Sequence, residues 1–193
     1  MKKTLKITWI LFLSVWGHAA WGQTAPPATS HLQLSLFPPI QLVSSDENIL
    51  GLRLGLLSAN RDVSGLDLGI VNLASGDETA VQWGIVNQVS GRFFGAQFGV
   101  LSLASGGFIG WQASLINLDS GKNVGFFNGA ANVAWESAVG FQLGCVNYAK
   151  DMTGLQVGFV NVANTLTGIQ LGLLNFISSR ENLPVLPLIN ASF

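Results

Sequence analysis

The sequence predicts an all-β protein: a short parallel β-solenoid of about nine coils, with non-repeat caps at both ends. Three observations predict this fold. An octet of the type Gly-Leu-Gln-Val-Gly-Phe-Val-Asn recurs every 14 or 15 residues. Within the octet, apolar residues alternate with small or polar ones, which is typical of a strand. An Asn or Ser closes each octet, so identical side chains would stack about 4.8 Å apart in successive coils.

The repeat array contains nine units, and we number each unit from its first residue as position 0. The units begin at Gly51, Gly65, Ala80, Gly95, Gly110, Gly125, Gly140, Gly154 and Gly168. Position 2 is Gln in six units, position 4 is Gly in eight and position 7 is Asn in seven. Positions 1, 3, 5, 6 and 8 are mainly apolar, and charges gather at positions 9 to 13. Each unit is therefore expected to form two short apolar stretches joined at a polar corner and followed by a solvated turn.

An outer-membrane antiparallel β-barrel of about 10 strands is the alternative fold. It is suggested by the C-terminal segment, which ends at Phe193 with apolar residues at alternate positions. The solenoid is favoured because the sequence repeats after one unit, whereas barrel hairpins would repeat after two. Stacked Asn side chains at position 7 also hydrogen-bond along an axis only when the units are parallel and in register.

The side chains at positions 1 and 3 are expected to point into a narrow core, because their volumes compensate. Trp111 is followed by Ala113, whereas Ala96 is followed by Phe98. Positions 0, 2 and 4 would then form a flat, exposed Gly-Gln-Gly face suited to docking, unless the glycines only accommodate tight coils. Parallel stacking would place Arg53 beside Asp67 as a surface pair worth about 0–1 kcal/mol.

The chain divides into four segments. Residues 1–22 have a lysine-containing start, an apolar stretch and small residues at Ala20 and Gly22, which are the parts of a secretory signal peptide. Residues 23–50 are expected to be a linker and capping strand, 51–182 the nine-repeat array, and 183–193 a C-terminal capping strand. Cleavage before Gln23 predicts an exported protein of the cell envelope, in the outer membrane, the periplasm or at the cell surface.

Composition excludes several functions. Removal of the leader would leave six Lys and Arg against ten Asp and Glu, which argues against a nucleic-acid partner. The single cysteine, Cys145, has no partner for an internal disulfide and is expected to be a buried small apolar residue. The only histidine beyond the leader, His31, makes neither a zinc site nor a Cys–His pair.

The sequence assigns no catalytic, cofactor-binding or metal-binding residue, and no cofactor. The carboxylates are expected to lie in the turns, interleaved with basic residues along one solvated edge; the residues concerned are Asp62, Asp77, Glu78, Asp119, Glu136 and Asp151. Parallel β-helices include enzymes that act on polysaccharides, so this activity remains a second alternative. No periodic cluster of oxygen ligands indicates a calcium site.

The octets Gly154–Asn161 and Gly168–Asn175, with the closing Leu-Pro-Leu-Ile-Asn-Ala-Ser-Phe, resemble a family of bacterial exported proteins with short surface repeats. The resemblance implies a place in a Gram-negative-type envelope and no reaction. The expected function is therefore non-enzymatic: a structural or interaction module whose partner is an envelope protein or a membrane surface. An integral outer-membrane barrel, for example a small pore, is the alternative.

Overall fold

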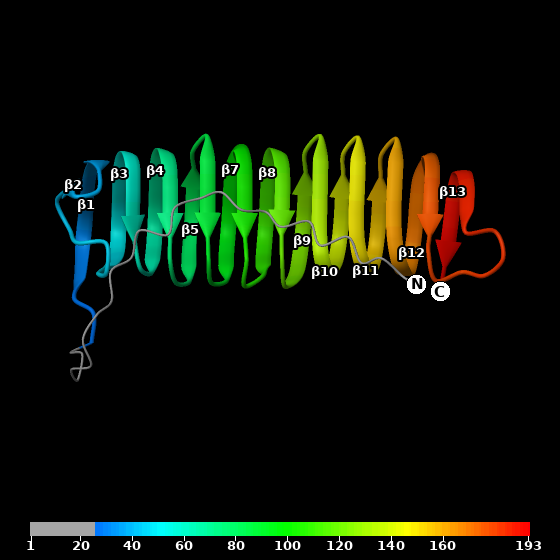
Figure 1. The fold of residues 1–193 in the computed structure, drawn as a ribbon, viewed down its shortest axis with the longest axis horizontal. Helices are drawn as coiled ribbons and strands as arrows, with labels where there is room; N and C mark the ends of the chain where they lie inside the picture. Colours follow the sequence, from blue (N-terminus) through cyan, green and yellow to red (C-terminus); the bar gives the residue numbers. More distant parts are fainter. Residues whose placement is uncertain (1–25) are drawn as a thin grey trace, which may run out of the picture.

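The structure is a computed structural model that describes residues 26–193, so the predicted leader at 1–22 and its cleavage site lie outside the described residues. The strands are β1 (Thr29–Phe37), β2 (Ile40–Gln41), β3 (Asn48–Asn60), β4 (Val63–Ala74), β5 (Glu78–Trp83), β6 (Val86–Val89), β7 (Phe93–Ala104), β8 (Phe108–Asp119), β9 (Lys122–Asn128), β10 (Ala131–Leu143), β11 (Val146–Val157), β12 (Val160–Ile177) and β13 (Val185–Ser192). They form one continuous sheet that winds as a solenoid (Figure 1).

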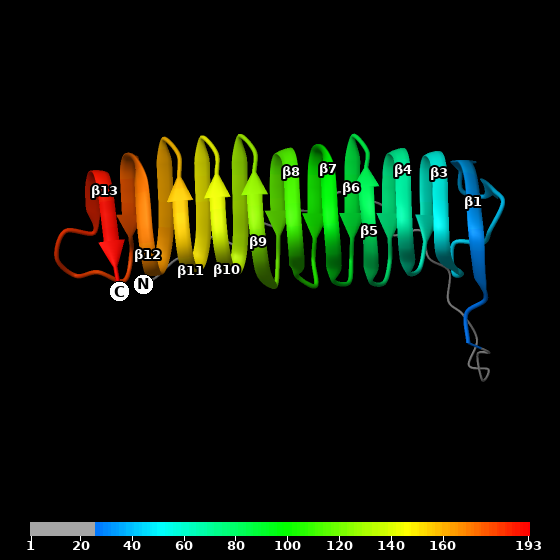
Figure 2. The ribbon, with the colours of Figure 1, turned by 180° about the vertical axis from the view of Figure 1, so that it is seen from behind.

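Successive coils stack in parallel and in the register that the repeat predicts. Position 0 of each coil pairs with position 0 of the next, as in Gly51 with Gly65 and Gly154 with Gly168. The long strand β4 pairs with β5 along its first half and with β6 along its second half, so each coil contributes to both faces of the solenoid. Both views show this winding (Figures 1 and 2). The predicted solenoid is confirmed, and the barrel alternative is wrong, because a barrel requires antiparallel neighbours.

The predicted orientation of the side chains is wrong. All six position-2 glutamines are fully or almost fully buried, whereas Trp83 at position 3 is 66% exposed and Trp111 at position 1 is 47% exposed. Alternation with period 2 establishes which positions share a face, but it does not determine which face is interior. The expected exposed Gly-Gln-Gly docking face is therefore the lining of the core, and positions 1 and 3 form the outer surface.

A ladder of glutamine side chains runs through the interior along the solenoid axis. The Nε2 of Gln97 donates to Oε1 of Gln82 at 2.6 Å, and the Nε2 of Gln112 donates to Oε1 of Gln97 at 2.7 Å. A second segment joins Gln142, Gln156 and Gln170 at 2.7 Å per step. Each amide thus replaces the water that it loses on burial with a neighbour one coil away.

A second ladder, of asparagines at position 7, holds the corner between the two faces. Each Nδ2 from Asn117 to Asn161 donates to Oδ1 of the asparagine in the next coil: Asn117 to Asn132 at 2.7 Å, and Asn132 to Asn147 at 2.8 Å. The same Nδ2 also donates to the main-chain carbonyl at position 3 of the next coil, as from Asn132 to Leu143 at 2.9 Å. These bonds satisfy backbone groups that the bend leaves without strand partners.

The breaks in the two ladders account for three of the six buried side-chain polar atoms without a hydrogen-bond partner among the described residues. Ser58 and Ser102 carry no amide to donate, so Oδ1 of Asn72 and Oδ1 of Asn117 in the following coils receive no hydrogen bond. Phe127 interrupts the glutamine ladder after Gln112, whose Oε1 is likewise without a donor. The asparagine and glutamine rows therefore work as continuous chains, and each interruption leaves one acceptor unpaired.

Close contacts favour glycine at two positions of the coil, although single units have Ala80 and Ser114 there. At position 0, Gly110 has a φ of 139°, and a Cβ there would lie 1.9 Å from the carbonyl oxygen of Gly95 in the preceding coil. At position 4, a Cβ on Gly84 would lie 2.5 Å from Nδ2 of Asn72 and 2.6 Å from Oδ1 of Asn87. The repeated glycines therefore make room for close coil stacking and for the asparagine ladder.

The two ends are closed differently. At the N-terminal end, β1 pairs in parallel with β3 and places Gln33 opposite Arg53, so β1 continues the position-2 register beyond the nine predicted units. Val43 then folds over this end, where its main-chain N–H and carbonyl bind the Gln33 amide. At the C-terminal end, β13 reverses direction and pairs antiparallel with β12. Both caps cover an edge that would otherwise leave strand hydrogen bonds open.

Ser114 is the exception at position 4, and it tests the fit between the ladder and glycine. Its hydroxyl lies 2.6 Å from that of Ser102, in the place where other coils have asparagine against glycine. We expect Ser102→Asn alone to be destabilising because its amide would clash with Ser114. Adding Ser114→Gly should restore stability, because it makes room for the new amide at position 102, which can then donate to Oδ1 of Asn117. Chemical denaturation should show a coupling of about 1–3 kcal/mol. Strict additivity of the two changes would contradict the ladder.

Candidate functional site

In the described part of the chain, the buried charged side chains of the first coils form one compact cluster. Arg53 and Asp67 occupy position 2 of adjacent coils, and the guanidinium Nη2 lies 2.6 Å and Nε 2.7 Å from the two carboxylate oxygens of Asp67. Nη1 of Arg53 donates to the carbonyl of Leu73 at 2.8 Å. Arg53 and Asp67 are fully buried, so the expected surface ion pair is in fact an interior bidentate pair. The predicted register of the two residues is confirmed.

Glu78 joins this cluster, although the sequence placed it in a solvated turn. Its Oε2 lies 3.9 Å from Nη2 of Arg53 and accepts a hydrogen bond from Gln82 at 2.9 Å. Burial, with the negative charge of Asp67 nearby, raises the pKa of the Glu78 carboxyl well above its ordinary value, although Arg53 opposes the shift. Burial also opposes the charged form of Arg53, but Asp67 outweighs it and raises the pKa of the guanidinium. The raised pKa favours the protonated form of Glu78, in which the cluster holds one ion pair and no net charge.

Asp119 is a second buried carboxyl that the sequence had placed at the solvated edge. Its Oδ1 accepts hydrogen bonds from Nε2 of Gln112 at 3.1 Å and from the main-chain N–H of Ala104 at 3.2 Å. Burial raises the pKa of Asp119 to about 7, and these two hydrogen bonds only partly oppose the shift. These interior carboxyls contact no solvent, so they shape stability and not surface chemistry.

The accessible surface of the array is apolar on three sides. Position 5 forms an exposed row along one long edge, which we call the corner ridge. Its members are Leu56, Ile70, Ile85, Val100, Leu115, Ala130, Cys145, Phe159 and Leu173. Phe159 is 61% exposed and Leu173 60% exposed. Positions 1 and 3 cover one adjoining face and positions 6 and 8 the other, with Gln88 and Asn128 as the amide side chains among them. Exposed apolar surface of this extent marks an interaction site.

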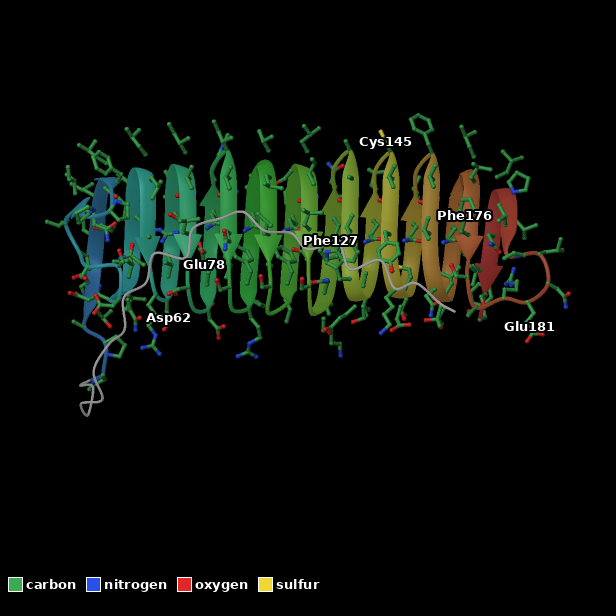
Figure 3. All side chains as sticks on the ribbon, viewed as in Figure 1. Asp62, Glu78, Phe127, Cys145, Phe176 and Glu181 are labelled. Carbon is green, nitrogen blue, oxygen red and sulfur yellow. The ribbon has the colours of Figure 1, made fainter. Side chains whose placement is uncertain are left out.

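The opposite long edge carries the exposed charges of the nine coils up to Ile177, and we call it the turn edge. Its charged residues lie at positions 10 to 12 and are Arg61, Asp62, Asp77, Arg92, Lys122, Glu136, Lys150 and Asp151. Figure 3 shows Cys145 on the corner ridge and Asp62 on the turn edge, at opposite sides of the molecule. The carboxylates partly stack between turns: Oδ1 of Asp62 accepts from the main-chain N–H of Asp77 at 2.9 Å.

Aromatic side chains line one apolar face in a continuous row. Trp83, Phe98, Trp111, Phe126 and Phe141 follow one another in consecutive coils. Phe98 and Trp111 meet edge to face with ring centroids 5.1 Å apart, and Phe126 and Phe141 stack at 5.1 Å. The volume compensation between positions 1 and 3 therefore lets these rings pack side by side on the outer surface. The expectation that these side chains fill a narrow core is therefore wrong.

The remaining sequence candidates lie apart from one another. Nδ1 of His31 lies 2.8 Å from the carbonyl of Leu50 at the exposed N-terminal end. Cys145 is exposed on the corner ridge, so the expectation that it is buried is wrong; the apolar register was correct, but that register points outward. Among residues 26–193, no three His, Cys, Asp or Glu side chains are grouped so as to hold a metal ion.

Comparison with known proteins yields no match to a protein-family model, to a curated protein or to a solved structure. Residues 26–193 contain no helix with the length and apolar character needed to cross a bilayer. The candidate site is therefore defined by geometry alone: it is the corner ridge with its two apolar flanks.

The buried carboxyl of Asp119 makes a prediction about pH. Its folded-state pKa of about 7 lies above the ordinary 3.8, so the protonated form is favoured by folding. The stability that this group contributes is full below the ordinary pKa and is lost as the pH rises to about 7, by on the order of 4 kcal/mol. Asp119→Asn copies Asn60, which occupies the same position of the first coil. The free energy of unfolding of this variant should depend less on pH, and above pH 7 it should exceed that of the wild type.

Denaturant titrations at several pH values measure this difference, with Asp151→Asn on the turn edge as the control. Glu78 contributes a slope of the same sign in all three proteins, so only the difference between them is diagnostic. An unchanged pH dependence in Asp119→Asn would show that this carboxyl is not buried.

Proposed function

We propose that this protein is a non-enzymatic module of the cell envelope, which acts as a rigid rod that associates with envelope components through its apolar exterior. The observation that carries this proposal is the inverted distribution of polarity in the coil. Amides and buried charges satisfy one another along the axis, whereas apolar side chains cover both faces and the corner ridge. A surface of that kind is costly in water and favourable against an apolar partner.

The rod itself suits a structural role. Each coil is bonded to its neighbours by main-chain and side-chain ladders, so the apolar rows keep a constant spacing along the array. The predicted leader and the resemblance to exported surface-repeat proteins support an envelope location. A polysaccharide-active enzyme, the remaining alternative, would need exposed carboxylates brought together on one face. Here, Asp67 and Glu78, whose carboxylates both accept a hydrogen bond from Gln82, are inside the core.

The corner ridge provides the test of this proposal. In fractionated cells that produce the full chain, we expect the protein in the envelope fraction. Replacing two ridge residues, Val100→Asn with Leu115→Asn, should shift it to the soluble fraction. Each change should weaken association roughly tenfold, because each removes an apolar side chain from the contact.

Ser105→Asn, at an exposed site on the turn edge, is the matched control and should leave the distribution unchanged. Melting temperatures of the purified variants would establish that all are folded. A wild-type protein found outside the envelope, or ridge variants retained there like the control, would contradict the proposed function.

A further inference from the structure

We infer that the partner of the apolar exterior is a lipid bilayer, into which the solenoid inserts its corner ridge lengthwise while the turn edge stays in water. This inference rests on the proposed function and specifies its partner. It follows from the segregation of charge, from the shape of the apolar surface and from the backbone hydrogen bonding at the ridge.

Charge is confined to one side of the rod. In the nine coils up to Ile177, the eight exposed charged residues all lie on the turn edge, and the corner ridge and the rows beside it at positions 1, 3 and 6 carry none. The boundary between the two zones runs parallel to the axis through every coil. A flat water–lipid boundary has this geometry, because it places one long edge in hydrocarbon and the other among headgroups and water.

The apolar surface is convex and continues over both flanks of the ridge. Leu115 lies at the ridge, with Ala113 on one flank and Ile116 on the other. A second copy or a globular partner that docks on one face would leave the ridge and the other flank exposed. Lipid chains cover a convex ridge from both sides at once, so they account for all three apolar surfaces together.

The backbone at the ridge is already paired, which hydrocarbon requires of any segment that enters it. The main-chain N–H of Ile85 donates to the carbonyl of Ile70 at 2.9 Å, and that of Val100 donates to Ile85 at 3.0 Å. The N–H of Cys145 donates to Ala130 at 2.9 Å. In these coils the bend therefore presents ridge residues to lipid whose main-chain N–H groups are already paired.

The dimensions fit one leaflet. The five residue-to-residue steps from position 5 to position 10 span roughly 16 Å at about 3.3 Å per step, which matches half of a hydrocarbon core of about 30 Å. The nine ridge residues extend about 38 Å at about 4.8 Å per coil. The rod thus reaches the bilayer midplane without crossing it.

A depth measurement tests this inference through the single cysteine. An environment-sensitive fluorophore on Cys145 of the full chain reports on the ridge. Lys150→Cys in a Cys145→Ala background places the same probe on the turn edge of the same coil. Both proteins are mixed with vesicles of phosphatidylethanolamine and phosphatidylglycerol, with and without nitroxide groups on the lipid chains. The Cys145 probe should shift to shorter wavelength and be quenched by the chain nitroxides. The probe on the turn edge should stay accessible to iodide.

Leu115→Asn in the Cys145-labelled protein should lower the vesicle affinity roughly tenfold, and Ser105→Asn should not. An unchanged emission wavelength of the Cys145 probe on addition of vesicles, without quenching by the chain nitroxides, would overturn the inference. If the ridge variants nevertheless leave the envelope fraction of fractionated cells, the proposed function would stand and the partner would be a protein. Equal responses at the two sites would overturn insertion by the ridge. Protection of the Cys145 probe that grows with protein concentration without lipid would overturn it in favour of a second copy.

Discussion

The hydrogen bond from one side-chain amide to the same amide in the next coil is the interaction on which the rest of the structure depends. Burying an amide without a hydrogen-bond partner costs much more free energy than burying one that is paired. A polar interior is therefore stable only if every coil keeps the same register. The Asn132 to Asn147 bond at 2.8 Å and the Gln112 to Gln97 bond at 2.7 Å impose this register in the two rows. The preference for glycine at positions 0 and 4 follows from it, because a Cβ at most of these sites would lie too close to the next coil or to the asparagine ladder; Ala80 and Ser114 are the exceptions.

The polar interior has a direct consequence for the exterior. Alternation places positions 1 and 3 opposite position 2, and positions 6 and 8 opposite position 7, so amides inside mean apolar side chains outside. The corner ridge extends the same surface around the bend. These residues are therefore exposed, and they form the surface that we propose for interaction. The charges that remain outside lie at the turn edge, where the alternation is interrupted.

Most of the fold was predictable from the sequence, because a repeat of 14 or 15 residues with Asn at position 7 is compatible with few architectures. Parallel stacking and the Arg53 and Asp67 register were predicted from that pattern and are confirmed, whereas β1, expected as a non-repeat cap, continues the parallel register before the nine units. The inside–outside assignment was wrong, because hydrophobicity places Trp111 inside by default, and only ladder geometry makes Gln112 the better core residue. The same error hid the corner ridge and the exposure of Cys145. The recurrence of Gln at one position was the signal that could have revealed both.

Hydrogen exchange of side-chain amides, measured by NMR, tests the polar core most directly. The amide of Gln88 lies on the exterior and provides an internal reference, whereas those of Gln97 and Asn132 are buried in the ladders. We expect the Gln97 and Asn132 side-chain protons to exchange far more slowly than those of Gln88, and the indole proton of Trp83 to exchange readily. Fast exchange at Gln97 and Asn132 together with a protected Trp83 would show that the coil is turned the other way, and would contradict the account.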